Sequence, residues 1–136
     1  MNIIEKGHNY GWPVVSFGLL DQTNLPTETT SKPGMDDPVA HYEPSSGICP
    51  VLVYNGNRFP NWKGSVLVGT MAHEELRRLT VDGGKVLKQE VVFKGIGRVR
   101  DIIVGPDGAF YLALATPGAN VAATTPGRVV RITPVQ

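Results

Sequence analysis

The stretch GIGRVRDIIVGPDGAFYLAL, residues 95–114, decides the fold, because it reads as two apolar strands joined by a tight turn. The Pro-Asp-Gly sequence at 106–108 supplies the turn, and apolar runs flank it on both sides. Arg98 and Arg100 stand one residue apart where the first strand begins. Because side chains alternate between the two faces of a strand, both guanidinium groups are expected on one side and Val99 on the other.

Two guanidinium groups that point the same way repel each other unless an anion lies between them. That anion is either a carboxylate of the same chain, for which Asp101 and Asp107 are candidates, or a bound ligand. The sequence by itself leaves both alternatives open. The arginine pair is therefore the first candidate site.

Four more strand signals follow one another between residues 50 and 95. The tripeptide Asp82-Gly83-Gly84 is a hairpin signal between the last two of them. The strands and their connections are all short, which predicts consecutive antiparallel pairing. A twisted meander of four such strands is one blade of a β-propeller. The four segments are PVLVYNG, GSVLVGTM, ELRRLTVDGG and KVLKQEVVFKG.

The segment MAHEELRRL, residues 71–79, is the place where a helix competes with this pattern. It is too short for a convincing helical period, and the residues before it are rich in β-formers. A hairpin turn around His73 and Glu74 is the preferred interpretation, and a single helical turn is the alternative.

The fold class expected from these patterns is all-β, with antiparallel four-stranded blades that form a partial β-propeller of about two and a half blades. Residues 50–95 are expected to make a complete blade, and residues 96–136 a blade of three strands. Residues 1–49 are expected to make an incomplete blade, with strands over 1–7 and 39–47 around a long polar loop. All three parts are expected to form a single domain.

Composition argues against nucleic acid and membrane as partners of this protein. The 136 residues carry a net charge of +1, and the basic residues are scattered, which argues against a nucleic-acid surface. No apolar run is long enough for a membrane-spanning helix. No signal peptide follows Met1, so a cytoplasmic location is expected for the chain as expressed.

The single cysteine, Cys49, has an apolar sequence context that predicts a buried, unreactive thiol.

Four segments, taken in order, resemble the C-terminal third of the glucose/sorbosone dehydrogenase family. They are NYGWP at 9–13, YNGNRFPNWKGSVLVG at 54–69, GRVRDIIVGPDGAFYLAL at 97–114 and GRVVRI at 127–132. Members of this family are aldose dehydrogenases that use pyrroloquinoline quinone (PQQ). The resemblance implies a six-bladed β-propeller of which this chain is a part, and a sugar as a candidate ligand.

The resemblance also implies candidate site residues. Arg98 and Arg100 match the family's arginine pair, which holds carboxylates of the quinone at the entry to an innermost strand. Ser45 falls near a cofactor-facing hydroxyl of the family. The family has a structural calcium close to the polar loop, where Asp21, Asp37 and the carbonyl of Tyr10 offer hard oxygen ligands. The alternative for these residues is a solvated acidic loop.

Other parts of the family's site have no counterpart in this chain. The catalytic histidine and the calcium loop beside the quinone lie in segments that match nothing here, and the family's lysine near the quinone falls at Ala72. The chain by itself is therefore expected to bind neither PQQ nor calcium and to lack catalysis. A non-enzymatic binding or assembly module and a remnant without a selected function are the alternatives.

An incomplete propeller is also expected to leave strand edges open. Exposed edges recruit other strands, and large apolar patches mark interfaces. A homo-oligomer is expected, with residues 1–6 or the strand at 127–134 pairing with an edge of a neighbouring subunit.

Overall fold

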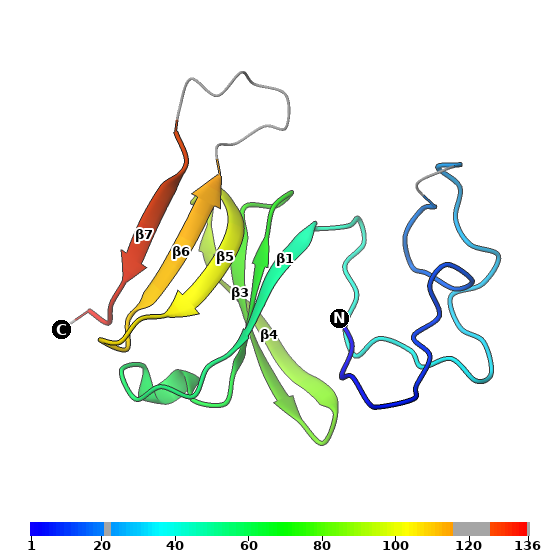
Figure 1. Cartoon of the computed structure of the whole chain (residues 1–136), viewed down its shortest axis with the longest axis horizontal. Coiled ribbons are helices and arrows are strands. Elements are labelled where there is room, and N and C mark those ends of the chain that lie inside the picture. Colours follow the sequence, from blue (N-terminus) through cyan, green and yellow to red (C-terminus); the bar gives the residue numbers. More distant parts are fainter. Residues whose placement is uncertain (21–22, 116–125, 136) are drawn as a thin grey trace. The chain divides into compact units, whose positions relative to one another are not determined.

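The computed structural model describes residues 1–20, 23–115 and 126–135. Contacts divide the chain into two compact units, residues 1–45 and 46–136. The described residues contain antiparallel β-sheets and no α-helix, which confirms the predicted all-β class (Figure 1). Within them, no helix is both long and apolar enough to span a membrane.

The first sheet of the C-terminal unit has four strands that pair in chain order. They are β1 (Ile48–Val53), β2 (Val66–Thr70), β3 (Glu75–Asp82) and β4 (Lys85–Lys94). Each strand is antiparallel to the next, as the meander pattern predicts. The long connection between β1 and β2 carries a single 3₁₀ turn, η1 (Pro60–Trp62).

The second sheet has three strands, β5 (Arg98–Val104), β6 (Phe110–Ala115) and β7 (Arg128–Ile132), also paired in chain order. The turn between β5 and β6 closes where the Pro-Asp-Gly sequence predicts it. Gly105 donates its N–H to the carbonyl of Ala109, and Gly108 donates to the carbonyl of Gly105. Among the described strands, β7 has a neighbour on one side alone, so it forms an edge.

Two predicted hairpins are confirmed. Gly83 and Gly84 form a two-residue loop between β3 and β4 with φ values of +52° and +75°, a conformation that glycine adopts without a Cβ penalty. Residues 71–74 connect β2 and β3 as a hairpin turn, and the alternative of a helical turn is wrong. The hydroxyl of Thr70 accepts a hydrogen bond from the N–H of Glu75 across that turn.

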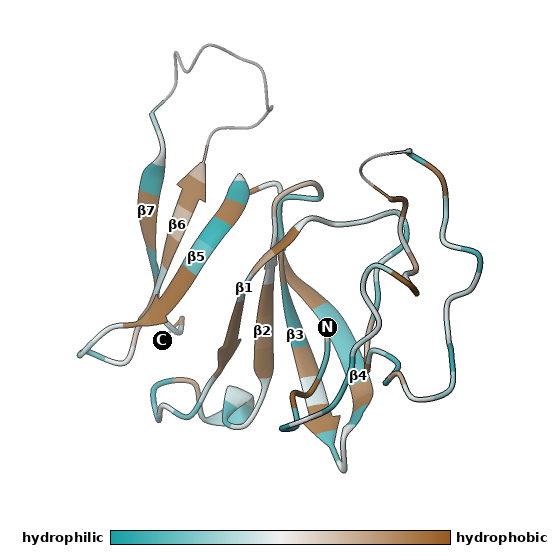
Figure 2. Cartoon of the chain, turned by 45° about the vertical axis from the view of Figure 1, so that its right-hand side comes forward, coloured by the Kyte–Doolittle hydropathy of each residue, from teal (hydrophilic) through white to brown (hydrophobic). Residues whose placement is uncertain are grey.

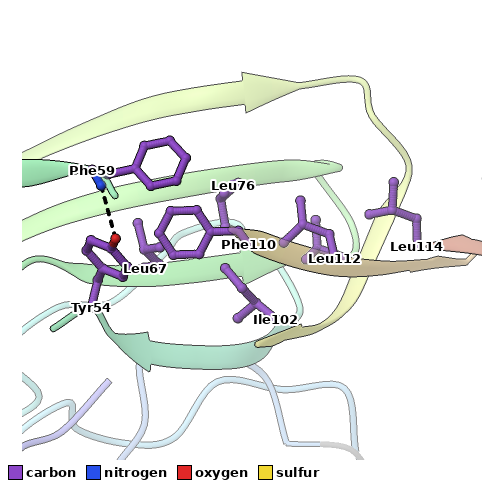
Figure 3. Packing of buried hydrophobic residues seen from close by; sticks show 9 residues of the cluster. Tyr54, Phe59, Leu67, Leu76, Ile102, Phe110, Leu112 and Leu114 are labelled. Carbon is purple, nitrogen blue, oxygen red and sulfur yellow. Dashed lines mark hydrogen bonds between the residues drawn. The ribbon is translucent and has the colours of Figure 1, made fainter. Parts of the chain in front are cut away.

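The core lies between the two sheets and follows the period-two pattern of β6. Phe110, Leu112 and Leu114 are buried, whereas the residues between them are partly exposed. These side chains meet Leu67 and Leu76 from the first sheet (Figure 3). Apolar residues dominate β2 and β6 (Figure 2).

An aromatic cluster closes one end of this core. The rings of Tyr54, Phe59 and Trp62 all contact the ring of Phe110, with centroid separations of 4.7 to 5.6 Å. The Tyr54 hydroxyl is fully buried, and it accepts a hydrogen bond from the N–H of Phe59 at 3.0 Å (Figure 3). The β1–β2 connection is therefore anchored in the core, although it contains no strand.

The N-terminal unit departs from the predicted incomplete blade. The strands expected over 1–7 and 39–47 are absent, and the described pairing in this unit is a bridge between Leu19 and Pro26. Local bonds take the place of a ladder: the Tyr10 hydroxyl donates to the carbonyl of Ile3 at 2.9 Å. Side chain-to-backbone bonds of this kind, together with prolines that lack an N–H, favour turns over strands.

Replacing Phe110 by Ala should lower the free energy of unfolding by about 3–5 kcal/mol, because the ring fills the space between the two sheets and its loss leaves a cavity. Urea denaturation followed by tryptophan fluorescence measures this change. Val129→Ala on the adjacent strand is the control: Val129 is 71% exposed, and its truncation should change stability by less than about 0.5 kcal/mol. Equal losses in the two variants would contradict the assignment of the core.

Candidate functional site

The arginine pair lies on an irregular part of β5. Arg98 is opposite Ala115 and Val99 is opposite Leu114, but the next pair joins Asp101 to Ala113. Arg100 is therefore the extra residue of a β-bulge, a feature that re-aims side chains at a strand end. Val99 is fully buried, while Arg100 is exposed and Arg98 half-buried, which agrees with the predicted separation of the arginines from Val99.

The two candidate carboxylate partners, Asp101 and Asp107, accept hydrogen bonds from other groups. Asp107 accepts hydrogen bonds from Arg131, which lowers the pKa of its carboxyl group. The carboxylate of Asp101 accepts the N–H of Ile102 at 2.8 Å. Among the ion pairs of the described residues, none involves Arg98 or Arg100. In the described residues, therefore, neither Arg98 nor Arg100 is paired with a carboxylate of the same chain.

Two sulfur atoms surround Arg100. Its Nη1 donates to Sδ of Met71 at 2.8 Å, and the Cys49 thiol donates to its backbone carbonyl at 3.1 Å. Cys49 is exposed, so the prediction of a buried thiol is wrong. The error arises because Cys49 points away from the core face of β1, on which Pro50 is buried. These contacts join β1 and the β2–β3 turn to the start of β5.

A serine–histidine contact lies in the same region, and sequence reasoning missed it. The hydroxyl of Ser46 is 3.1 Å from Nδ1 of His73, and Ser46 is 1% exposed. The β2–β3 turn is held to this segment by two backbone bonds, from Ala72 to the carbonyl of Ser46 and from Met71 to that of Gly47. The buried hydroxyl of Ser46 therefore holds the imidazole of His73 in place on the β2–β3 turn.

A buried ion pair supports the strand ends next to this turn. Oε2 of Glu75 accepts from Nε and Nη2 of Arg77 at 2.8 and 2.6 Å, and Lys94 approaches Oε1 at 3.2 Å. Burial by itself would raise the pKa of the Glu75 carboxyl, but the hydrogen bonds from Arg77 and Lys94 hold the pKa below its usual value. The start of β3 and the end of β4 are thus fixed by charge as well as by the ladder.

The remaining candidate residues belong to the N-terminal unit. Ser45 is exposed at its last position, and Asp37 accepts a hydrogen bond from the Ser31 hydroxyl. Asp21 lies outside the described residues. In the described part of the chain, no three His, Cys, Asp or Glu side chains converge as metal ligands. The calcium ligands Tyr10, Asp21 and Asp37, and the cofactor contact at Ser45, stay predictions.

Comparison with known proteins identifies the family to which this chain belongs. The profile of the family Glucose / Sorbosone dehydrogenase matches residues 1–122. The chain belongs to this family, as its sequence motifs predict.

Individual relatives agree with the family assignment. An uncharacterized protein of Synechocystis sp. is 38% identical over 113 residues, and the aldose sugar dehydrogenase YliI of Escherichia coli is 30% identical over 115 residues. Each alignment covers 82% of this chain, and they cover 27% and 31% of the two relatives. The chain thus spans about a third of the length of these relatives.

Solved structures match the fold over almost the whole chain. A glucose dehydrogenase crystal structure superposes with a TM-score of 0.81 at 30% identity, covering 98% of this chain and 38% of its own. The PQQ-bound aldose sugar dehydrogenase of Streptomyces coelicolor superposes with a TM-score of 0.67 at 24% identity, covering 96% of this chain and 34% of its own. The match to dehydrogenase propellers confirms the partial propeller expected from the strand pattern.

Replacing Glu75 by Gln should lower the free energy of unfolding by roughly 3 kcal/mol at pH 7, because it removes the buried negative charge that pairs with the half-buried guanidinium of Arg77. The stabilisation is complete above the unfolded carboxyl pKa of about 4.3, and it is lost as the pH falls through the lower pKa of folded Glu75. Urea denaturation between pH 2.5 and 7 should therefore show the two proteins converging at the acidic end.

Lys94→Gln is the control for the Glu75 ion pair. The Lys94 side chain is 74% exposed, so its removal should cost at most about 1 kcal/mol. A constant difference between wild type and Glu75→Gln across the whole pH range would show that the carboxylate charge is not what stabilises the strand ends.

Proposed function

We propose that this chain supplies the carboxylate-binding part of a PQQ-dependent aldose dehydrogenase and does not turn over by itself. The observation that carries the proposal is the pair Arg98 and Arg100 at the start of β5, neither of which forms an ion pair in the described residues. Family membership and the PQQ-bound form of the Streptomyces coelicolor relative support a quinone as the missing anion.

The residues present fit such a group. Guanidinium groups bind planar carboxylates through two parallel hydrogen bonds, and PQQ is a planar, aromatic polycarboxylate. The bulge at Arg100 presents its side chain at the strand end, and fully buried Val99 anchors the backbone between the arginines. When bound, PQQ supplies the hydride acceptor for oxidation of an aldose at its anomeric carbon.

The other residues of this region have a supporting role in the proposal. Met71 contacts the Arg100 guanidinium and Cys49 the Arg100 backbone, so the rotamer and the main chain of this residue are both held before a ligand arrives. Preorganised donors lower the ordering cost of binding. The family's catalytic histidine and its calcium loop match no segment of this sequence. For this reason we expect no turnover by the chain alone. General base catalysis alone contributes roughly 10²–10⁴-fold.

Changing Arg98 and Arg100 together to Gln should weaken PQQ binding by at least about tenfold, because two charge-assisted hydrogen-bonding groups are lost. Titration of the protein with PQQ, followed by tryptophan fluorescence and by the quinone absorbance, measures the dissociation constant. With saturating PQQ, calcium and an aldose, wild type should show no aldose-dependent dye reduction.

Arg58→Gln is the matched control for charge. Arg58 donates to the carbonyl of Asp107, in the turn at the far end of β5, so its loss should leave PQQ affinity within about twofold because such distances are screened by salt. Unchanged affinity in the Arg98/Arg100 variant would reject the site. If wild type oxidised the sugar at the rate of a complete family member, the proposal that the chain alone does not turn over would be wrong.

A second role, assembly with another copy of the chain, is favoured by the exposed apolar residues of the second sheet. Val129 on the edge strand β7 is 71% exposed, and Ile103 on β5 is 55% exposed. Edge strands with exposed apolar side chains pair with other strands unless charges prevent it. We propose that the β7 edges of two subunits pair in a homo-oligomer.

Assembly should appear in sedimentation velocity as a concentration-dependent species larger than one chain between 1 and 100 µM. Val129→Lys should return the protein to a single chain mass, because a charge on an edge strand opposes pairing. The variant's far-ultraviolet circular dichroism should match that of wild type. A wild-type protein that sediments as one chain over the whole range would contradict the assembly role.

A further inference from the structure

The guanidinium group of Arg100 is held by a weak acceptor. Its Nη1 donates to Sδ of Met71 at 2.8 Å, and no carboxylate of the described residues pairs with it. A thioether sulfur accepts hydrogen bonds only weakly. The contact therefore orients Arg100 in the absence of a ligand, and a stronger acceptor at the same place would hold the guanidinium more tightly.

The position of Met71 is fixed by the β2–β3 turn. Its N–H donates to the carbonyl of Gly47 at 2.9 Å, and the next residue, Ala72, donates to the carbonyl of Ser46 at 2.9 Å. The terminal methyl of Met71 lies 3.6 Å from the point where a Cβ on Gly47 would lie. The side chain thus packs against Gly47 through its methyl group and contacts Arg100 through its sulfur.

The contact between Met71 and Arg100 is open to small solutes. Arg100 is exposed, and Met71 is half-buried rather than enclosed in the core. The thiol of Cys49, which donates to the backbone carbonyl of Arg100, is exposed as well. Oxidants as small as hydrogen peroxide convert accessible methionine to methionine sulfoxide. A molecule of this size can therefore reach Sδ of Met71 in the folded protein.

We propose that Met71 is an oxidation site that regulates anion binding through Arg100. The inference rests on the proposed function, in which Arg98 and Arg100 bind carboxylates of a quinone. The oxidant is hydrogen peroxide: a lone pair of Sδ attacks one peroxide oxygen, and the S–O bond forms as the O–O bond breaks. The leaving oxygen takes the proton of the transferred hydroxyl and departs as water. Sulfur loses two electrons, and the peroxide gains them.

The added oxygen changes the acceptor that faces Arg100. Oxidation turns an apolar thioether into a polar sulfoxide, and a hydrogen bond from a charged guanidinium is about twice as strong as one between neutral groups. The oxygen of oxidised Met71 therefore competes with a ligand carboxylate for the same donors. Arg98 is left to bind the anion alone, so oxidation weakens the site without abolishing it. Methionine sulfoxide reductases reverse the modification, which makes it a switch.

Isothermal titration with PQQ before and after peroxide treatment, with the peroxide removed, tests the switch. The parent protein is Cys49→Ser, because an exposed thiol reacts with the same oxidant. Peptide mass spectrometry should locate an added oxygen on Met71, and the dissociation constant for PQQ should rise by about five- to tenfold. Met71→Leu, which keeps an apolar side chain of similar size, should change its dissociation constant by less than about twofold on treatment.

Two matched variants separate the switch from general oxidative damage. Met35→Leu removes another half-buried methionine, in the N-terminal unit, and should keep the full response to peroxide. Arg100→Gln removes the donor, so its weaker PQQ binding should change by less than about twofold on oxidation. An Arg100→Gln protein that loses as much affinity as the parent would show that the sulfoxide acts by disturbing the fold. That result, or the absence of oxygen on Met71 after treatment that oxidises Met35, would overturn the proposal.

Urea denaturation distinguishes failure of this inference from failure of the proposed function. If the sulfoxide holds Arg100, oxidation should lower the denaturation midpoint more in Arg100→Gln than in the parent, because the new oxygen then lacks its donor. If the parent binds PQQ through the arginine pair but oxidation of Met71 changes no affinity, the switch is wrong and the proposed function stands. If no PQQ binds before or after treatment, the proposed function and the regulation of binding are both overturned, and the midpoints decide whether the sulfoxide holds Arg100.

Discussion

The packing of the two sheets against each other is the constraint on which the rest of the C-terminal unit depends. A four-stranded and a three-stranded sheet each have an apolar face, and neither face is stable in water. Phe110 lies at the centre of the interface and contacts aromatic rings from the β1–β2 connection. Because each core leucine buried there stabilises the fold by about 1.5–3 kcal/mol, the position of β5 relative to β1 and β2 is determined by the core. Because Arg98 and Arg100 belong to β5, the packing of the two sheets also fixes the position of the arginine pair.

Most of the C-terminal unit could be predicted because its signals are local. Period-two alternation identifies β6, and paired glycines identify the β3–β4 turn. The structure begins β1 at Ile48, within two residues of the expected start of the blade. The N-terminal unit could not be predicted in the same way. Its apolar residues near 1–7 look like a strand, but a strand needs a partner to form a ladder, and the described residues of this unit form turns stabilised by side chains.

The candidate site could be predicted only in part, because motif matching identifies residues but not the side chains that surround them in space. The resemblance predicts Arg98 and Arg100 as site residues, and period-two alternation predicts that both avoid the core. The bulge is invisible in the sequence, since it depends on the pairing of Val99 and Asp101 with β6. The contacts of Ser46 with His73 and of Arg128 with Ile96 join residues 27 and 32 positions apart. Contacts of this range depend on strand register, which no local pattern specifies.

The distribution of charge distinguishes the proposed anion site at Arg98 and Arg100 from the structural ion pairs. Glu75 is matched by Arg77 and Lys94, Glu90 by Arg78 and Lys88, and Asp107 by Arg131. These pairs hold strand ends and turns, and none of them includes Arg98 or Arg100 at the corner where β5 begins. Like charges in proximity destabilise a folded protein, and an anion bound there would relieve the repulsion. By linkage, such a ligand must stabilise the fold in proportion to its affinity, so binding at this corner and the stability of the second sheet are coupled quantities.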